Sequence, residues 1–133
     1  MGRTRTRTAA GIVLDSGALI ALERGDKRMI ALLQRALAQG RAFRVPAGVV
    51  GQVWRSGRFQ VTLARFLRGE EVEIVPLDEQ LARSCGELCG AASASDVIDA
   101  SVVIIARERQ DLIVTSDPGD LRRLDPTAQI ITV

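Results

Sequence analysis

The sequence predicts a single α/β domain of three layers, in which helices flank a short central parallel sheet. Short apolar runs alternate with longer segments whose apolar residues recur every three or four positions, the pattern of strands alternating with helices. The chain of 133 residues has the length of one domain, and 47% of its residues are hydrophobic, which supplies a sizeable core. Strands that alternate with helices in one small domain favour parallel pairing.

Five short apolar runs predict the strands. They are rich in Val, Ile and Leu, as expected for strands that are buried in a parallel sheet. Pro46 and Pro76 directly follow the second and third runs, where a proline ends a strand. The predicted strands are 11–14, 43–45, 72–75, 112–115 and 129–133.

The segments between these strands carry helix signals. Asp26 and Asp78 each precede an amphipathic segment, as N-cap residues do. Gly40 ends the segment that follows Asp26, and Gly69 ends another. The first predicted helix begins near Ser16. The predicted helices cover about 16–22, 27–39, 49–54, 59–67, 79–89, 97–106 and 121–124.

The helix near 97–106 is the element around which the chain is organised. It is so apolar that we expect it to be buried nearly all round. The small residues 90–95 are expected to form the loop that leads into it, with Ser93 or Ser95 as its N-cap.

Four carboxylates are expected to meet at one edge of the sheet. Asp96 and Asp99 are three positions apart, so they share a face of the central helix, where two like charges repel. Asp15 directly follows the first strand and Asp117 closely follows the fourth, and ligands bind outside the carboxyl ends of parallel strands. Each aspartate taken alone is better explained as a helix cap or a solvated turn residue. Their convergence predicts an all-oxygen site for Mg²⁺ or Mn²⁺.

The composition excludes several other kinds of site. There is no histidine, which removes Ser-His-Asp and Cys-His catalysis and the usual zinc ligand sets. Cys85 and Cys89 are expected to be buried free thiols in a reducing compartment, the cytoplasm. No apolar run approaches the ~18 residues of a membrane span. No Gly-rich loop of the Walker type occurs, so hydrolysis of nucleoside triphosphates is not expected.

The remaining chemistry that suits an acidic, metal-binding site is hydrolysis of a phosphodiester. A divalent metal lowers the pKa of a bound water and stabilises charge on the leaving oxygen. The net charge of +2 is too small to identify a nucleic-acid binder. Arginine supplies all but one of the 18 basic residues, which either reflects phosphate contacts or only the base composition of the genome.

Four segments in this order resemble the PIN-domain ribonucleases, and more narrowly the VapC toxins of bacterial toxin–antitoxin pairs. They are IVLDSGALIALE, VPAGVVGQVWR, DVIDASVVIIA and IVTSDPGDL. The resemblance implies a PIN-like fold over residues 11–133, behind a basic tail at 1–10 that we expect to be disordered. It also implies a cytoplasmic Mg²⁺- or Mn²⁺-dependent endoribonuclease, an RNA substrate, a VapB-like antitoxin and a homodimer. Asp15, Asp99 and Asp117 match the family aspartates.

One position departs from the family pattern. Gln52 stands where the family usually has a glutamate, and an amide is a poorer metal ligand and cannot serve as a base. Asp96 either supplies the missing charge, as a fourth catalytic and metal-binding carboxylate, or the site is weakened. Gln52 is also explained as a plain solvent-facing helix residue. Two alternatives therefore stay open: a catalytically silent PIN module that binds RNA or a partner protein, and a nuclease that acts on DNA.

Further residues are candidates for supporting roles. Asp120 is either a residue behind the metal ligands or a helix cap. Arg55 is a candidate RNA contact, together with Trp54 and Arg58. The helices over 16–39 carry more apolar residues than a small domain can easily hide, so we expect the antitoxin to cover an exposed patch there. The patch is predicted to include Leu22, Met29, Leu33 and Leu37.

Overall fold

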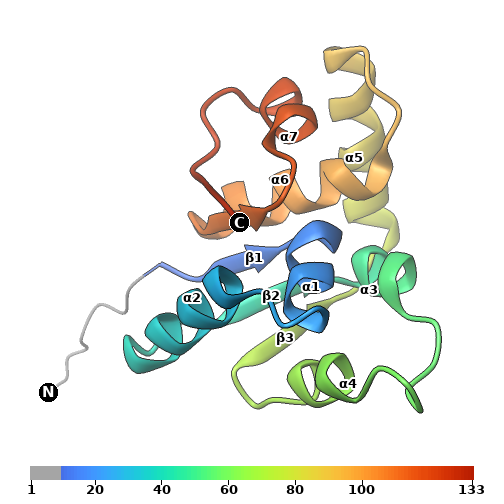
Figure 1. Ribbon diagram of the computed structural model, residues 1–133. Coiled ribbons are helices and arrows are strands. Elements are labelled where there is room, and N and C mark those ends of the chain that lie inside the picture. Colours follow the sequence, from blue (N-terminus) through green and yellow to red (C-terminus); the bar gives the residue numbers. More distant parts are fainter. Residues whose placement is uncertain (1–9) are drawn as a thin grey trace, which may run out of the picture.

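Five parallel strands form one central sheet in the computed structural model, which describes residues 10–133 (Figure 1). The basic tail predicted at 1–10 lies outside the described residues, apart from Ala10. The strands are β1 (Ile12–Leu14), β2 (Phe43–Pro46), β3 (Val72–Val75), β4 (Leu112–Thr115) and β5 (Ile130–Thr132). Their order across the sheet is β3-β2-β1-β4-β5, which confirms the predicted parallel sheet and puts β1 at its centre.

Helices cover both faces of the sheet (Figure 1). The chain moves outward from β1 to β3, then returns to β4 and continues to β5. Because crossovers between parallel strands are right-handed, these two directions of travel put their helices on opposite faces. One face carries α1 (Ser16–Glu23), α2 (Lys27–Ala38), α3 (Ala47–Val53) and α4 (Val61–Leu67). The other face carries α5 (Glu79–Ala92), α6 (Val97–Arg109) and α7 (Pro118–Leu124).

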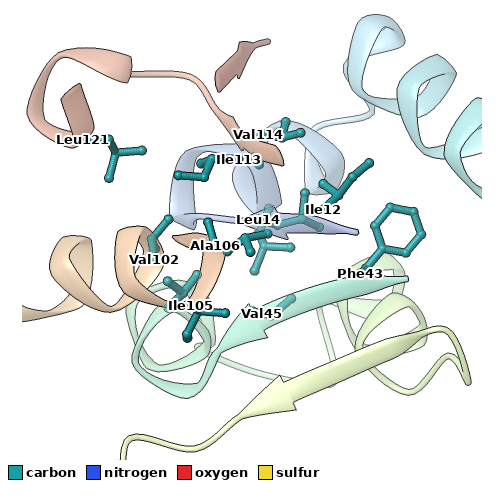
Figure 2. Close-up of a cluster of buried hydrophobic side chains, with 14 of the residues drawn as sticks. Ile12, Leu14, Phe43, Val45, Val102, Ile105, Ala106, Ile113, Val114 and Leu121 are labelled. Atoms are coloured by element: carbon teal, nitrogen blue, oxygen red, sulfur yellow. The ribbon is translucent and has the colours of Figure 1, made fainter. Parts of the chain in front are cut away.

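Helix α6 is the centre of the second layer, as predicted. It packs on β1, β2 and β4, and it is flanked by α5 and α7. Every residue from Ala100 to Ala106 is buried. Figure 2 shows Val102, Ile105 and Ala106 beside the strand residues Leu14 and Val45. Burial of each such aliphatic side chain contributes about 1.5–3 kcal/mol, so this contact fixes where α6 lies on the sheet.

The junction between α5 and α6 differs from the prediction. Helix α5 continues to Ala92 and ends at Ser93, which has a left-handed φ of 54°, so the predicted loop is shorter. Asp96 is the N-cap of α6, because its Oδ1 accepts a hydrogen bond from the N–H of Asp99 at 2.9 Å. The prediction that Ser93 or Ser95 caps this helix was therefore wrong.

The apolar residues predicted to be exposed on the first two helices are mostly buried. Leu22, Met29 and Leu33 are at most 7% exposed, and only Leu37 lies open to solvent, at 47%. This prediction was wrong because these side chains join the same core cluster as β1, so the two helices turn their apolar faces towards the sheet.

No single helix within residues 10–133 is both long and apolar enough to cross a membrane. Only α5 and α6 taken together, with a bend of 105° between them, would meet those requirements of length and composition.

Candidate functional site

The candidate site lies where the direction of the sheet connections reverses. Strands β1 and β4 are neighbours, but β1 leads into α1 on one face and β4 leads into α7 on the other. Ligands in open parallel sheets bind in the crevice at such a point, outside the carboxyl ends of the strands. Asp15 and Asp117 follow these two strands. The two strand ends approach closely, since a Cβ at Gly17 would collide with the hydroxyl of Ser116.

Thr115 connects the two strand-end aspartates. Its hydroxyl donates a hydrogen bond to Oδ2 of Asp15 and accepts one from the N–H of Asp117 at 3.0 Å. Oδ1 of Asp15 accepts a further hydrogen bond from the N–H of Ala18 at 3.0 Å, which caps α1. Both carboxylate oxygens of Asp15 therefore have fixed donors.

Thr115 was missed by the sequence reasoning. It is fully buried at the last position of β4, where a threonine is ordinary for a strand. The signal that could have found it is a hydroxyl at the carboxyl end of a buried strand, two residues before a candidate ligand.

Burial dominates the electrostatics of Asp15. It raises the pKa of this carboxyl, and the nearby charge of Asp117 raises it further. The hydrogen bonds from Thr115, Ala18 and Gly17 act in the opposite direction and lower the pKa. Their donors stabilise the ionised form that a cation requires.

Asp99 lies where the fields of the other carboxylates meet. Burial contributes most to raising its pKa to about 6, followed by the charges of Asp96, Asp120, Asp15 and Asp117. The charges that act on Asp99 thus come from the other three predicted ligands and from Asp120, which the sequence predicted as a supporting residue. A cation bound beside this half-buried aspartate would stabilise its ionised form.

Asp96 and Asp120 border the same pocket as Asp99. Asp96 is exposed, and its carbonyl oxygen accepts a hydrogen bond from the thiol of Cys89 at 3.6 Å. Asp117, not Asp120, occupies the N-cap position of α7, so Asp120 is not a helix cap. The pocket has a volume of about 330 Å³ and is lined by Ser93, Ala94, Ser95, Asp96, Asp99, Asp120, Arg123 and Leu124.

Gln52 lies on the side of α3 that approaches α6. It follows Gly48 by one helical turn, and a Cβ at Gly48 would lie 3.0 Å from Ile98 in the first turn of α6. The Gln52 side chain is exposed, and it makes no hydrogen bond within residues 10–133. Arg55 folds back on the end of α3, where its Nη1 donates to the carbonyl oxygen of Trp54 at 2.7 Å.

The donor set suits a hard divalent cation that keeps much of its water. Within the described part of the chain, no three Asp, Glu, Cys or His side chains are arranged as a metal cage. Mg²⁺ is usually held by one or two carboxylates, with waters and substrate phosphates completing its shell. The carboxylates around Asp99 fit that open type of site, in which the substrate supplies part of the coordination.

A larger pocket of about 410 Å³ lies elsewhere. Its lining includes Gln110 and Asp111, just before β4, and Gln129, just before β5, so it opens at the amino ends of the strands. None of the five clustered aspartates lines it. The concentration of carboxylates, rather than pocket size, therefore identifies the candidate site.

Comparisons with known proteins bear on the family and the fold of this chain. Residues 12–125 match the family model for the PIN domain. VapBC2 from Rickettsia felis, solved bound to a DNA fragment from its promoter, is 16% identical with a TM-score of 0.68, covering 91% of this chain and 97% of that one. FitAcB from Neisseria gonorrhoeae is 18% identical with a TM-score of 0.65, over 91% and 96% of the two chains.

A third solved structure is VapC20 from Mycobacterium tuberculosis, described as a toxin that cleaves the sarcin-ricin loop. It is 17% identical with a TM-score of 0.64, over 81% of this chain and 91% of that one. At these identities the likeness shows a shared fold. Among curated protein sequences there is no significant match.

Proposed function

Because this chain belongs to the PIN domain family, we propose that it is a metal-dependent endoribonuclease toxin of a VapBC-type toxin–antitoxin pair. The observation that carries this proposal is the gathering of Asp96, Asp120, Asp15 and Asp117 around Asp99, whose pKa is raised to about 6 by burial first and then by their charges. A chain without histidine that gathers carboxylates at the switch point of a parallel sheet is suited to metal-assisted phosphodiester hydrolysis.

In this proposal three aspartates bind the metal ion, and the residues around them have supporting roles. Asp15, Asp99 and Asp117 hold Mg²⁺ or Mn²⁺, which when bound supplies an activated water and stabilises charge on the leaving oxygen. Thr115 orients Asp15 through the hydrogen bond to Oδ2. Asp96 adds negative charge at the same pocket while its Oδ1 caps α6.

The test is cleavage of purified RNA by the native chain and by Asp99→Asn. We expect cleavage in Mg²⁺ or Mn²⁺, loss of cleavage in EDTA, and a fall of at least about a hundredfold in the variant. DNA of the same sequence is the control for substrate class. Undiminished cleavage in excess EDTA would refute the metal-dependent mechanism, and equal cleavage of DNA would refute the assignment to RNA.

A second candidate function is a silent PIN module that binds RNA or a partner protein without cutting. Gln52 favours it, because the amide on α3 provides no charge where the family usually has a glutamate. Metal-independent RNA binding with no cleavage in any divalent cation would support this candidate over the nuclease.

The partner surface that we propose is the α3–α4 apolar face, defined as Trp54, Phe59 and Val61. Their exposed fractions are 38%, 82% and 53%. An apolar groove of about 330 Å³ continues this face. The groove is lined by Val50, Trp54, Ala64, Leu67, Arg68 and Ile74.

The loop that presents this face is firmly held. Oε1 of the buried Gln60 accepts hydrogen bonds from the N–H groups of Arg55 and Ser56 at 2.7 and 2.8 Å. Its Nε2 donates to the carbonyl oxygen of Val53 at 2.9 Å. A fixed loop that keeps Phe59 in water is expected to meet a partner, since exposed apolar patches mark interaction sites.

We propose that a VapB-like antitoxin segment covers the α3–α4 apolar face. Toxin–antitoxin complexes among the solved structures of similar fold support a partner of this kind.

The free, buried thiols of Cys85 and Cys89 suit the reducing cytoplasm. A homodimer stays a prediction.

A further inference from the structure

One arginine shares the pocket of the candidate site. Arg123 lies on α7, one turn after Asp120, and both side chains line the pocket that also holds Asp96 and Asp99. Leu121 and Leu124 anchor α7 in the hydrophobic core, because they are only 1% and 6% exposed. The buried pair fixes the rotation of α7, so the pocket-facing position of Arg123 is set by the fold.

Arg123 has no ion-pair partner within residues 10–133, although three carboxylates line the same pocket. It also makes no hydrogen bond to the described residues. Four other arginines within residues 10–133 do form ion pairs with carboxylates, at N–O distances within 4.0 Å. They are Arg44, Arg83, Arg107 and Arg109. The guanidinium of Arg123 is therefore available to an incoming group.

The charge of the pocket indicates what that group is. Its lining carries three carboxylates and one cationic side chain, Arg123. An RNA strand that approaches such a site is repelled unless cations neutralise its phosphates. A guanidinium binds phosphate oxygens through two parallel hydrogen bonds, which fixes position as well as charge.

We infer that Arg123 binds a backbone phosphate of the RNA substrate next to the carboxylates, and so sets where the strand crosses the site. The inference rests on the proposed function, because it takes RNA as the substrate. Arg122 is the natural control: it is the neighbouring exposed arginine on the same helix, but it does not line the pocket.

In the competing role, Arg123 does not contact RNA, and its positive charge only offsets the negative charges of Asp99 and Asp120. The two roles predict different outcomes for Arg123→Gln. If Arg123 only offsets the carboxylate charges, its loss would leave the salt dependence of RNA binding unchanged. It would shift the pH profile of cleavage to higher pH, because the carboxylates would hold their protons more tightly. Loss of a phosphate contact would reduce the salt dependence and leave the pH profile in place.

The experiment measures binding of a short fluorescein-labelled RNA of mixed sequence by anisotropy, between about 50 and 200 mM salt. Binding is measured in an Asp117→Asn background, which removes a charge at the site without removing a side-chain cap hydrogen bond. Arg123→Gln is compared with Arg122→Gln and Arg123→Lys, and each is also assayed for cleavage in the otherwise native chain.

We expect Arg123→Gln to bind about tenfold more weakly and to lower the slope of log affinity against log salt by about 0.7–0.9. Arg123→Lys should retain the slope but not the full affinity, and Arg122→Gln should retain both. Two results would overturn the inference while the native chain still cleaves RNA and the proposed function stands. One is that Arg123→Gln keeps the salt slope of its Asp117→Asn parent. The other is that Arg123→Gln and Arg122→Gln lose equal affinity for RNA. If the native chain neither binds nor cleaves RNA, the proposed function fails and the inference fails with it.

Discussion

Thr115 and Asp15 are 100 residues apart in the chain, yet the threonine hydroxyl donates a hydrogen bond to the aspartate carboxylate at the ends of two neighbouring strands. The same hydroxyl accepts the N–H of Asp117 at 3.0 Å. One buried side chain thus sets the positions of two candidate metal ligands relative to each other.

Replacing Thr115 by valine is expected to damage both the site and the fold. The shape of the side chain is kept, but Asp15 loses a donor and the N–H of Asp117 loses its acceptor. Hydrogen bonds to charged groups are worth about 1.5–3 kcal/mol, so the free energy of unfolding should fall by that amount in denaturant titrations. Cleavage of RNA should fall about 10–100-fold, as for residues that orient metal ligands.

Ser116→Ala is the matched control for this substitution. It removes an exposed hydroxyl from the next residue, which neither donates to Asp15 nor accepts from Asp117. If Thr115→Val and Ser116→Ala behave alike in stability and in cleavage, the positioning role of Thr115 is wrong.

The raised pKa of Asp99 predicts a particular dependence of stability on pH. The folded pKa is about 6 and the ordinary value is 3.8, so the folded state holds this proton more tightly than the unfolded state. The stability that protonated Asp99 contributes is fully present below pH 3.8 and is lost as pH rises to about 6. Asp15, whose pKa is also raised, adds in the same direction.

Asp99→Asn removes this loss and should therefore melt at a higher temperature than the native chain near neutral pH. The difference should shrink as the pH falls below 3.8, where the native Asp99 is protonated in both the folded and the unfolded state. Mg²⁺ should raise the melting temperature of the native chain more than that of the variant, because it binds the folded carboxylates. A variant that is less stable than the native chain near neutrality would contradict the repulsion argument.

The strands were the most predictable part of the fold. The runs at 72–75 and 112–115 coincide with β3 and β4, since each is a short β-branched segment with a clear stop signal. The start of α6 was harder, because Ser93, Ser95 and Asp96 all suit an N-cap. The choice depends on the left-handed turn at Ser93, which is a property of the backbone and not of composition.

The candidate site was predictable where it depends on strand ends and not where it depends on distant contacts. Asp15 and Asp117 could be placed because the carboxyl ends of parallel strands share an edge. The role of Thr115 could not be seen, because its partner Asp15 is remote in sequence. The burial of Met29 could not be seen either, since periodicity shows that a helix has an apolar face but not what covers it.

Gln52→Glu tests whether α3 belongs to the site. If Gln52 faces the metal, the new carboxylate should tighten Mn²⁺ binding, measured by calorimetry, and raise the cleavage rate. The double variant with Asp96→Asn should recover what Asp96→Asn alone loses, because residues that share a metal are coupled. Gln34→Glu, an exposed position on α2, is the control for added charge. Plain additivity of Gln52→Glu and Asp96→Asn would show that the two do not share a metal.

Phe59→Ser tests the α3–α4 apolar face as the antitoxin surface. Phe59 is 82% exposed, so the folded chain should keep its stability, while the complex with the VapB-like antitoxin should weaken by at least about 2 kcal/mol. Leu37→Ser, at the exposed leucine of α2, is the matched control and should bind normally. The measurement is the dissociation constant by calorimetry. Weaker binding by Leu37→Ser alone would move the partner surface to α2.

We propose that carboxylates at the β1–β4 switch point direct a water to attack an RNA phosphodiester. The most direct measurement is the chemistry of the new RNA ends after cleavage in Mg²⁺, read by mass spectrometry on an RNA that carries a single 2′-deoxy nucleotide at the cut. Attack by water needs no 2′-hydroxyl, so we expect this RNA to be cut and the phosphate left at the break to be a linear monoester. Cyclic 2′,3′-phosphate ends on ordinary RNA, with no cleavage at the 2′-deoxy position, would contradict it.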